Sequence, residues 1–209
     1  MVFMNKPKPK SRENVLSPEE REKLCKVCQT DREKFVIYGL LYTGMREGEF
    51  LHMRKSWIDF KGGIINIPHK DICKICLTCK KSKMRKGKLI KDANIWQGKT
   101  VHAQRPIPIV PEIKDMLDEF FSKYNSVIDV YWYRQNLWKI VKEVGARSKI
   151  KHSVFPHCLR ATFATMLVEK GMDNPVKLKD IMGWKKLEQS TDYIRLGGAS
   201  MKRALDDIW

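Results

Sequence analysis

The sequence predicts a mainly α-helical fold that carries one small antiparallel β-sheet. Two observations support this α+β class. Apolar residues recur at helical spacing behind capping residues in both halves of the chain, and two short β-like runs between them flank Lys61-Gly62-Gly63. With 43% hydrophobic residues among 209, the chain can bury a sizeable core, so the chain as a whole is neither a disordered tail nor a disulfide miniprotein. No apolar run approaches the roughly 18 residues of a membrane span, so we expect no membrane association.

Three helices are predicted before the sheet. Ser17-Pro18-Glu19-Glu20 supplies an N-cap, a proline at the first helical position and a capping-box glutamate, so a helix starts there and runs to about Cys28. Asp31 can cap a second helix that ends at Thr43-Gly44, and residues 46–53 form a short third one. Residues 1–14, which lack periodicity, are predicted to be a basic tail or a linker remnant, and residues 15–209 one domain.

The sheet is predicted from a hairpin and one later strand. Residues 57–60 and 64–67 flank a turn whose glycines supply the positive φ that a tight hairpin needs. Residues 105–109 resume the β pattern, and their two prolines place them at a sheet edge. A lysine-rich insertion at about residues 69–98 separates the two parts. Further helices are predicted over residues 111–124, 132–144, 157–170, 175–182 and 188–196.

The charge of the chain indicates a polyanionic partner. Lys and Arg number 41 against 24 Asp and Glu, a formal net charge of +17. Neutralised phosphates release counterions, so nucleic acid is the first partner to consider, with a solvated basic surface as the alternative. Eleven Lys and Arg but only two Asp lie between Lys70 and Arg105. We expect this segment to follow DNA phosphates through Lys80, Lys81, Lys83, Arg85, Lys86, Lys88 and Arg105.

The insertion also contains a cysteine motif. Cys73, Cys76 and Cys79 follow one another at a spacing typical of thiolate ligands, with His69 upstream and His102 downstream. We predict one structural zinc ion held by the three thiolates and one of these histidines. The alternative is a flexible loop with free thiols. Clustered cysteines do not fit a secreted disulfide framework, so we expect an intracellular protein.

Several polar residues acquire meaning from their order. His157 and Arg160 share a helix face, yet such a pair is common on solvated helices, and a lone Tyr193 is typical of a core. Their order, however, resembles the catalytic series of the tyrosine recombinases, the phage-integrase family, from about Ser17 to Leu196. The matching pieces are Thr43-Gly44-Met45-Arg46-Glu47-Gly48-Glu49, Lys99 nine residues before Pro108, Phe155-Pro156-His157-Cys158-Leu159-Arg160, Met182-Gly183-Trp184, and Tyr193.

The resemblance implies a tyrosine-recombinase-like catalytic domain that cuts and rejoins duplex DNA through a 3′-phosphotyrosine. In that chemistry Arg46 and Arg160 would bind phosphate oxygens, and Tyr193 would attack phosphorus. Lys99 would protonate the leaving 5′-oxygen, while His157 would assist proton transfer from the phenol. Trp184 would donate its indole N–H, and Glu49 would orient Arg46 or His157. No cofactor is required for catalysis.

Two features depart from the family's pattern, and the sequence allows several alternatives. Trp184 stands where the family most often has histidine, and the insertion leaves Lys88 and Lys91 as alternatives to Lys99. A type IB topoisomerase-like enzyme and an inactive DNA-binding relative are the competing functions. We expect self-association on DNA as a dimer or tetramer, in a cell or the host of a virus or mobile element. The chain is either an excised catalytic domain or a naturally short recombinase, and the target sequence and direction of recombination are not fixed.

Overall fold

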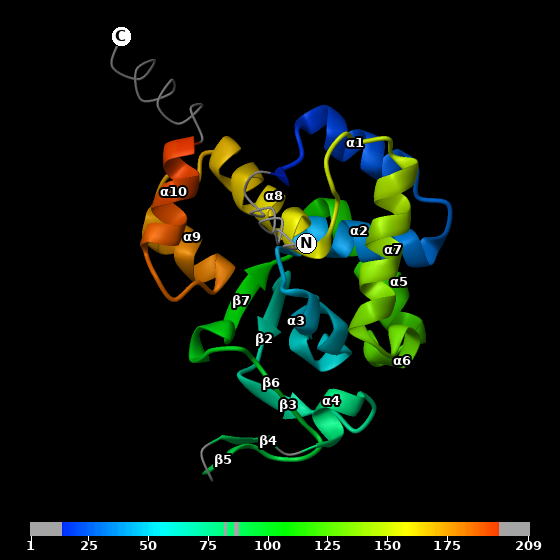
Figure 1. Ribbon diagram of the computed structural model, residues 1–209, viewed down its shortest axis with the longest axis vertical. Helices are drawn as coiled ribbons and strands as arrows, with labels where there is room; N and C mark the ends of the chain where they lie inside the picture. Colours follow the sequence, from blue (N-terminus) through cyan, green and yellow to red (C-terminus); the bar gives the residue numbers. More distant parts are fainter. Residues whose placement is uncertain (1–13, 82, 86–87, 197–209) are drawn as a thin grey trace, which may run out of the picture.

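Figure 1 shows the computed structural model, which describes residues 14–81, 83–85 and 88–196. The first part contains helices α1 (Pro18–Lys26), α2 (Asp31–Thr43) and α3 (Glu47–His52), the short helix η2 (Lys55–Trp57) and strands β1 (Ile58–Asp59) and β2 (Ile64–Ile67). The insertion contains β3 (Lys70–Ile72), α4 (Leu77–Lys80), β4 (Lys83–Arg85), β5 (Lys88–Lys91) and β6 (Ile95–Gln97). The rest contains η3 (Val101–Ala103), β7 (Arg105–Pro108), α5 (Pro111–Lys123), α6 (Ile128–Tyr131), α7 (Arg134–Arg147), α8 (Pro156–Glu169), α9 (Pro175–Met182) and α10 (Glu188–Leu196).

Helix α2 lies at the centre of the larger core. It packs against α5, α7 and α8, and its Phe35 ring stacks on Phe120 of α5 with the ring centroids 3.9 Å apart. The capping box predicted at Ser17 and Glu20 is present at the start of α1. The cap of α2 differs from the prediction, because the hydroxyl of Thr30, not Asp31, accepts the N–H of Glu33 at 3.2 Å.

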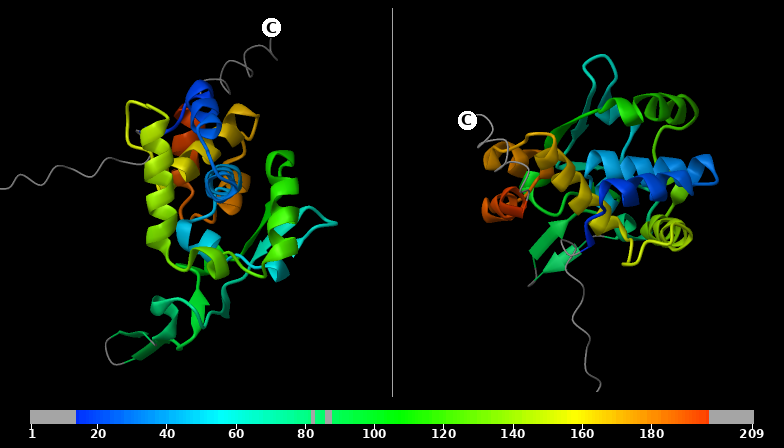
Figure 2. Two further views of the ribbon diagram at one scale, coloured as in Figure 1. Left: turned by 90° about the vertical axis from the view of Figure 1, so that its right-hand side faces the viewer. Right: turned by 90° about the horizontal axis from the view of Figure 1, so that it is seen from above.

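The predicted hairpin and edge strand form one antiparallel sheet in the order β1-β2-β7. In its register, Ile65 lies opposite Ile58 on one side and Ile107 on the other. Strand β7 is an edge, as its prolines predicted. The expectation of a single sheet was wrong, because the insertion folds into two further antiparallel ladders, β3 with β6 and β4 with β5. The ladder β4–β5 lies at the far end of the insertion in Figures 1 and 2.

A second, smaller core lies on the other side of α8. Phe163 and Val168 of α8 pack there with Leu178 and Met182 of α9 and with Tyr193 of α10. The predicted bounds of α9 and α10 are confirmed, whereas the short helix α6 was not predicted. Helix α8 therefore joins both cores, and Arg160 in its second turn lies at their junction. Within the described ranges, no helix is long and apolar enough to cross a membrane.

Candidate active site

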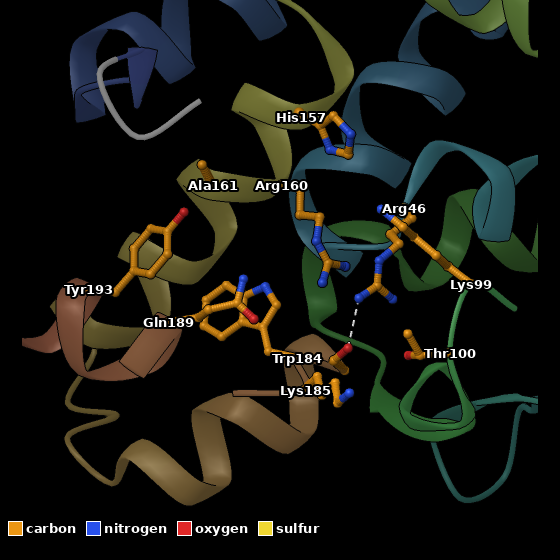
Figure 3. Close-up of a pocket in the computed structure, with 11 residues that line it drawn as sticks. Arg46, Lys99, Thr100, His157, Arg160, Ala161, Trp184, Lys185, Gln189 and Tyr193 are labelled. Carbon is orange, nitrogen blue, oxygen red and sulfur yellow. Dashed lines mark hydrogen bonds between the residues drawn. The ribbon is translucent and has the colours of Figure 1, made fainter. Parts of the chain in front are cut away.

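All six residues predicted to act on a phosphodiester line one pocket. Figure 3 shows this pocket, a cavity of about 360 Å³. The N-cap of α3, the loop after β6, the start of α8, the loop after α9, and α10 each contribute to it. The predicted residues that line it are Arg46, Lys99, His157, Arg160, Trp184 and Tyr193. Side chains that are far apart in the sequence thus surround a single space.

Arg46 is held by contacts on two sides. Its Nη1 donates to Oε1 of Glu49 at 2.6 Å, and its Nη2 donates to the carbonyl oxygen of Gly183 at 2.7 Å, the dashed line in Figure 3. The backbone N–H of Arg46 also donates to Oε2 of Glu49 at 2.8 Å. Because a guanidinium has five N–H donors, these contacts fix its plane and leave further donors for a phosphate.

Glu49 lies beneath Arg46 and is 2% exposed, so it is not an ordinary surface glutamate. Burial alone would raise its pKa, but the charge and hydrogen bonds of Arg105, followed by the charge of Arg46, outweigh burial and lower the pKa to about 2. The carboxylate is therefore ionised at neutral pH. Glu49 contacts Arg46 as the predicted orienting role requires, and that role itself stays a prediction.

The prediction that Arg105 contacts DNA does not fit its place in the structure. Its side chain is buried, and Nη2 donates to Oε2 of Glu49 at 2.8 Å. Its Nη1 and Nε donate to the carbonyl oxygens of Ala103 and Ile181 at 2.8 and 2.7 Å. The alternation of β7 could have revealed this, because Arg105 lies two residues before the buried Ile107 and so on the same face.

Arg160 points from α8 into the pocket, and its backbone partners hold it there. Nη1 donates to the carbonyl oxygen of Gly44, and Nη2 donates to that of Met182. Burial, together with the charges of Arg46 and Arg105, lowers the pKa of Arg160 to about 9. The side chain therefore remains cationic at neutral pH, although two further arginines lie nearby.

Gly183 brings the turn after α9 close to both arginines. Its φ is +59°, and an added Cβ would lie 2.7 Å from the carbonyl oxygen of His102 and 2.9 Å from Nη1 of Arg105. A side chain at this position would thus clash and would strain the backbone. The carbonyl groups of Met182 and Gly183 accept from Arg160 and Arg46, respectively, so this turn positions two cations at once.

The candidate nucleophile packs against the tryptophan of the same pocket. The rings of Tyr193 and Trp184 are stacked, with centroids 5.1 Å apart and planes at 14°. The two residues are 7% and 9% exposed. Trp184 therefore fixes the plane of the Tyr193 ring, and Figure 3 shows the phenol across the pocket from Arg46 and Lys99.

The two candidate proton carriers lie at the exposed part of the pocket. Lys99 lies in the loop after β6, and His157 lies in the first turn of α8. Partial desolvation at the pocket wall, and then the positive charges of Arg160, Arg46 and Lys99, lower the pKa of His157. Its imidazole is thus neutral at neutral pH and able to accept a proton.

Five further residues line the pocket but were not among the predicted catalytic residues. They are Thr100, Ala161, Gly183, Lys185 and Gln189. Thr100 and Lys185 follow Lys99 and Trp184 directly in the chain, so adjacency to predicted residues was the available signal. Gln189 precedes Tyr193 by one helical turn on α10, which places both on the same helix face.

The predicted DNA-contacting residues of the insertion fall into three groups. Lys80 and Lys81 are exposed around the end of α4. Lys83 and Arg85 belong to strand β4, and Lys88 belongs to strand β5. Lys86 lies outside the described residues. Their contact with DNA remains a prediction.

The cysteine motif does fold into one cluster, but with a different histidine. Cys73, Cys76 and Cys79 are buried together with His52, the last residue of α3. The expectation of His69 or His102 as the fourth member was wrong, since neither belongs to this group and His102 is exposed. His52 lies outside the insertion, so the spacing of residues within the insertion gave no indication of it.

The fold is that of a tyrosine-recombinase catalytic domain. The crystal structure of XerA recombinase is similar to this chain, with a TM-score of 0.66 and 18% identity. The alignment covers 99% of this chain and 66% of the XerA chain. The Tn1549 transposon integrase in complex with transposon right end DNA aligns with 91% of this chain and 63% of that chain, with a TM-score of 0.65 and 18% identity. The chain belongs to the phage integrase family, whose model matches residues 14–198.

Curated relatives agree with this family. Tyrosine recombinase XerA of Pyrococcus furiosus is 28% identical over 208 residues, which are 95% of this chain and 63% of the relative. Tyrosine recombinase XerD of Neisseria meningitidis is 29% identical over 164 residues, or 78% of this chain and 50% of the relative. The chain thus spans less than two thirds of the length of these curated relatives.

Proposed function

We propose that this domain cuts and rejoins duplex DNA in site-specific recombination through a 3′-phosphotyrosine. The observation that carries the proposal is the single pocket in which Arg46, Arg160 and Tyr193 meet Lys99 and His157. Two fixed cations, one phenol and two proton carriers are the groups that transfer of a phosphoryl group requires. All six residues predicted to act on the phosphodiester line this pocket. This disfavours the alternative that the chain is a catalytically inactive DNA-binding relative.

In the proposed step, the Tyr193 oxygen forms a bond to phosphorus while the bond from phosphorus to the 5′-oxygen breaks. The neutral imidazole of His157 accepts the phenolic proton, and Lys99 gives a proton to the departing oxygen. Arg46 and Arg160 donate to the nonbridging oxygens, where negative charge develops. Trp184 donates its indole N–H to the same phosphate.

The phosphotyrosine retains the bond energy, so a 5′-hydroxyl can attack it and restore a phosphodiester. Rejoining to a different strand then gives recombination. His157 takes the phenolic proton and Lys99 supplies the proton of the leaving oxygen, so no cofactor takes part in this step.

The partner in this proposal is double-stranded DNA, on which copies of the protein assemble as a dimer or tetramer. The net charge of +17 favours such a polyanion, and the similar Tn1549 integrase was solved in complex with DNA. The protein would act inside the cell, on the DNA of a chromosome, virus or mobile element.

The test uses the 209-residue chain and a randomised pool of nicked duplexes whose cleaved end cannot religate. After denaturing electrophoresis, a covalent protein–DNA band is expected for the wild type and for the exposed-tyrosine control Tyr133→Phe, but not for Tyr193→Phe. Sequencing the trapped DNA gives the target. A covalent band that persists in Tyr193→Phe would remove Tyr193 from its role, and joining between two different duplexes separates recombination from topoisomerase-like relaxation.

A further inference from the structure

We propose that His52, Cys73, Cys76 and Cys79 bind one zinc ion, which fastens the basic insertion to helix α3. The four ligand atoms all lie within 4.8 Å of one another, and all four residues are buried. The inference rests on the cluster alone and holds whether or not the proposed DNA chemistry is correct.

The spacing of the ligand atoms matches tetrahedral zinc. Nε2 of His52 lies 3.5 Å from Sγ of Cys76 and 3.5 Å from Sγ of Cys79. With Zn–S near 2.3 Å and Zn–N near 2.0–2.1 Å, the edge of a regular tetrahedron between sulfur and nitrogen is about 3.5 Å. Three cysteines and one histidine form a closed set, with no position left for water, which is typical of structural zinc.

The histidine is oriented as a ligand. Its Nδ1 lies 2.7 Å from the carbonyl oxygen of Gly48, and a carbonyl can only accept, so Nδ1 carries the proton. The lone pair of Nε2 therefore points at the sulfur atoms. One lone pair can accept only one thiol proton, yet two sulfurs lie at the same distance from it. A metal ion at the centre satisfies all four groups.

The thiols are also prepared by their own backbone. The three cysteines are free of disulfide bonds. The N–H of Cys79 donates to Sγ of Cys76 at 3.3 Å, a contact that holds this sulfur in place within the cluster. The indole ring of Trp96 stacks on the imidazole of His52, with centroids 5.4 Å apart, and covers one side of the cluster.

The insertion needs such a link because it has almost no apolar core. Among the described side chains of residues 69–81 and 91–98, the buried ones are those of the three cysteines and Trp96. Of its larger aliphatic residues in these ranges, Ile72, Ile75 and Leu77 are 55%, 42% and 61% exposed, and Ile95 is half-buried. A lysine-rich segment of this kind cannot order itself by hydrophobic burial, so metal binding supplies the missing free energy of folding.

The ion would join two parts of the chain that matter for the pocket. His52 ends α3, the helix whose N-cap is Arg46. On the insertion side, the backbone of Asn94 pairs with both Cys73 and Cys79, at 2.7 and 2.6 Å, and the chain then runs through β6 to Lys99. The zinc site thus fixes the base of the insertion beside the helix that positions Arg46.

Metal analysis of the purified full chain tests the proposal directly. We expect about one zinc per chain, and a cobalt-substituted protein with thiolate-to-metal charge-transfer and tetrahedral visible bands. His52→Ala should weaken zinc binding by at least about 10²-fold, as should Cys76→Ser. The matched controls His102→Ala and Cys28→Ser should keep the full equivalent.

Because His52→Ala could unfold the chain, His52→Cys provides a second variant. It replaces the ligand by a thiolate, so we expect it to retain one zinc ion, and cobalt bands shifted toward those of a four-sulfur site. Zinc-free wild-type protein with all six thiols titratable would overturn the proposal. A zinc ion that survives in His52→Ala but is lost in His102→Ala would also overturn it.

Discussion

Nη2 of Arg105 lies 2.8 Å from Oε2 of Glu49, and the two side chains are 4% and 3% exposed. The other oxygen of Glu49 accepts from Arg46 at 2.6 Å. One buried carboxylate therefore links an arginine that cannot reach solvent to an arginine that lines the pocket. Arg105 contributes by positioning Glu49, and Glu49 in turn positions Arg46.

Glu49→Gln should lower the free energy of unfolding by about 3 to 5 kcal/mol near neutral pH, because it leaves the buried charge of Arg105 unpaired. The folded-state pKa of Glu49 is about 2, below its ordinary value of 4.5. Its stabilisation is therefore complete above about pH 4.5 and is lost as the pH falls toward 2.

Urea unfolding of the wild type and Glu49→Gln across the acid range measures this effect. The gap between the two proteins should shrink as the pH falls. Glu119→Gln, whose partner Lys123 is exposed, is the control and should change stability little. A gap that stays constant down to about pH 3 would contradict the lowered pKa of Glu49.

Local patterns allowed much of this fold to be predicted. Helix starts and ends depend on residues that are close together in the sequence. Examples are the capping box at Ser17, the proline at the start of α9 and the glycines that end α2 and α9. The pocket residues themselves were predicted from their order along the chain. Their meeting in one cavity needed the structure.

Long-range pairing explains what was missed. The contact of His52 with the cysteines joins α3 to a segment that begins 21 residues later, and no helical or strand period connects them. Arg105 was predicted to contact DNA because of its charge. The carboxylate that neutralises this charge, Glu49, lies 56 residues earlier in the chain, so no local pattern indicated the pair. In both cases the partner is set by tertiary packing and not by neighbours in sequence.

The pH dependence of cleavage should reflect His157. Its pKa is lowered by desolvation and then by the nearby cations, so the neutral imidazole persists below the ordinary histidine value of 6.5. The rate of covalent-complex formation should therefore stay level on lowering the pH to 6.5 and fall only below it. Single-turnover rates over the acid range measure this fall, which is the acidic limb of the pH–rate profile. In His157→Gln the rate should be lower and this limb absent, whereas a wild-type limb above pH 6.5 would contradict the assignment.

Lys99 can be tested with a substrate that needs no proton on its leaving group. Lys99→Ala should be strongly impaired on an ordinary phosphodiester, by about 10²-fold or more, because general acids contribute that much. A 5′-phosphorothiolate, whose sulfur leaves without a proton, should restore its rate. Lys88→Ala and Lys91→Ala are the matched controls, and each should behave alike on both substrates. Equal impairment of Lys99→Ala on the two substrates would exclude it as the general acid.

The basic insertion should account for part of the salt dependence of DNA binding. Each phosphate contact contributes about 0.9 to the slope of log K against log salt, so replacing Lys80, Lys81 and Lys83 by alanine should reduce its magnitude by about 2 to 3. The control replaces Lys26, Lys34 and Lys123 by alanine, which removes the same amount of positive charge. These three lysines lie outside the insertion and pair with Glu22, Asp31 and Glu119. Binding isotherms at several salt concentrations measure both slopes. An equal change in the two triple variants would show that net charge alone acts, and an unchanged slope in the first would place the insertion away from DNA.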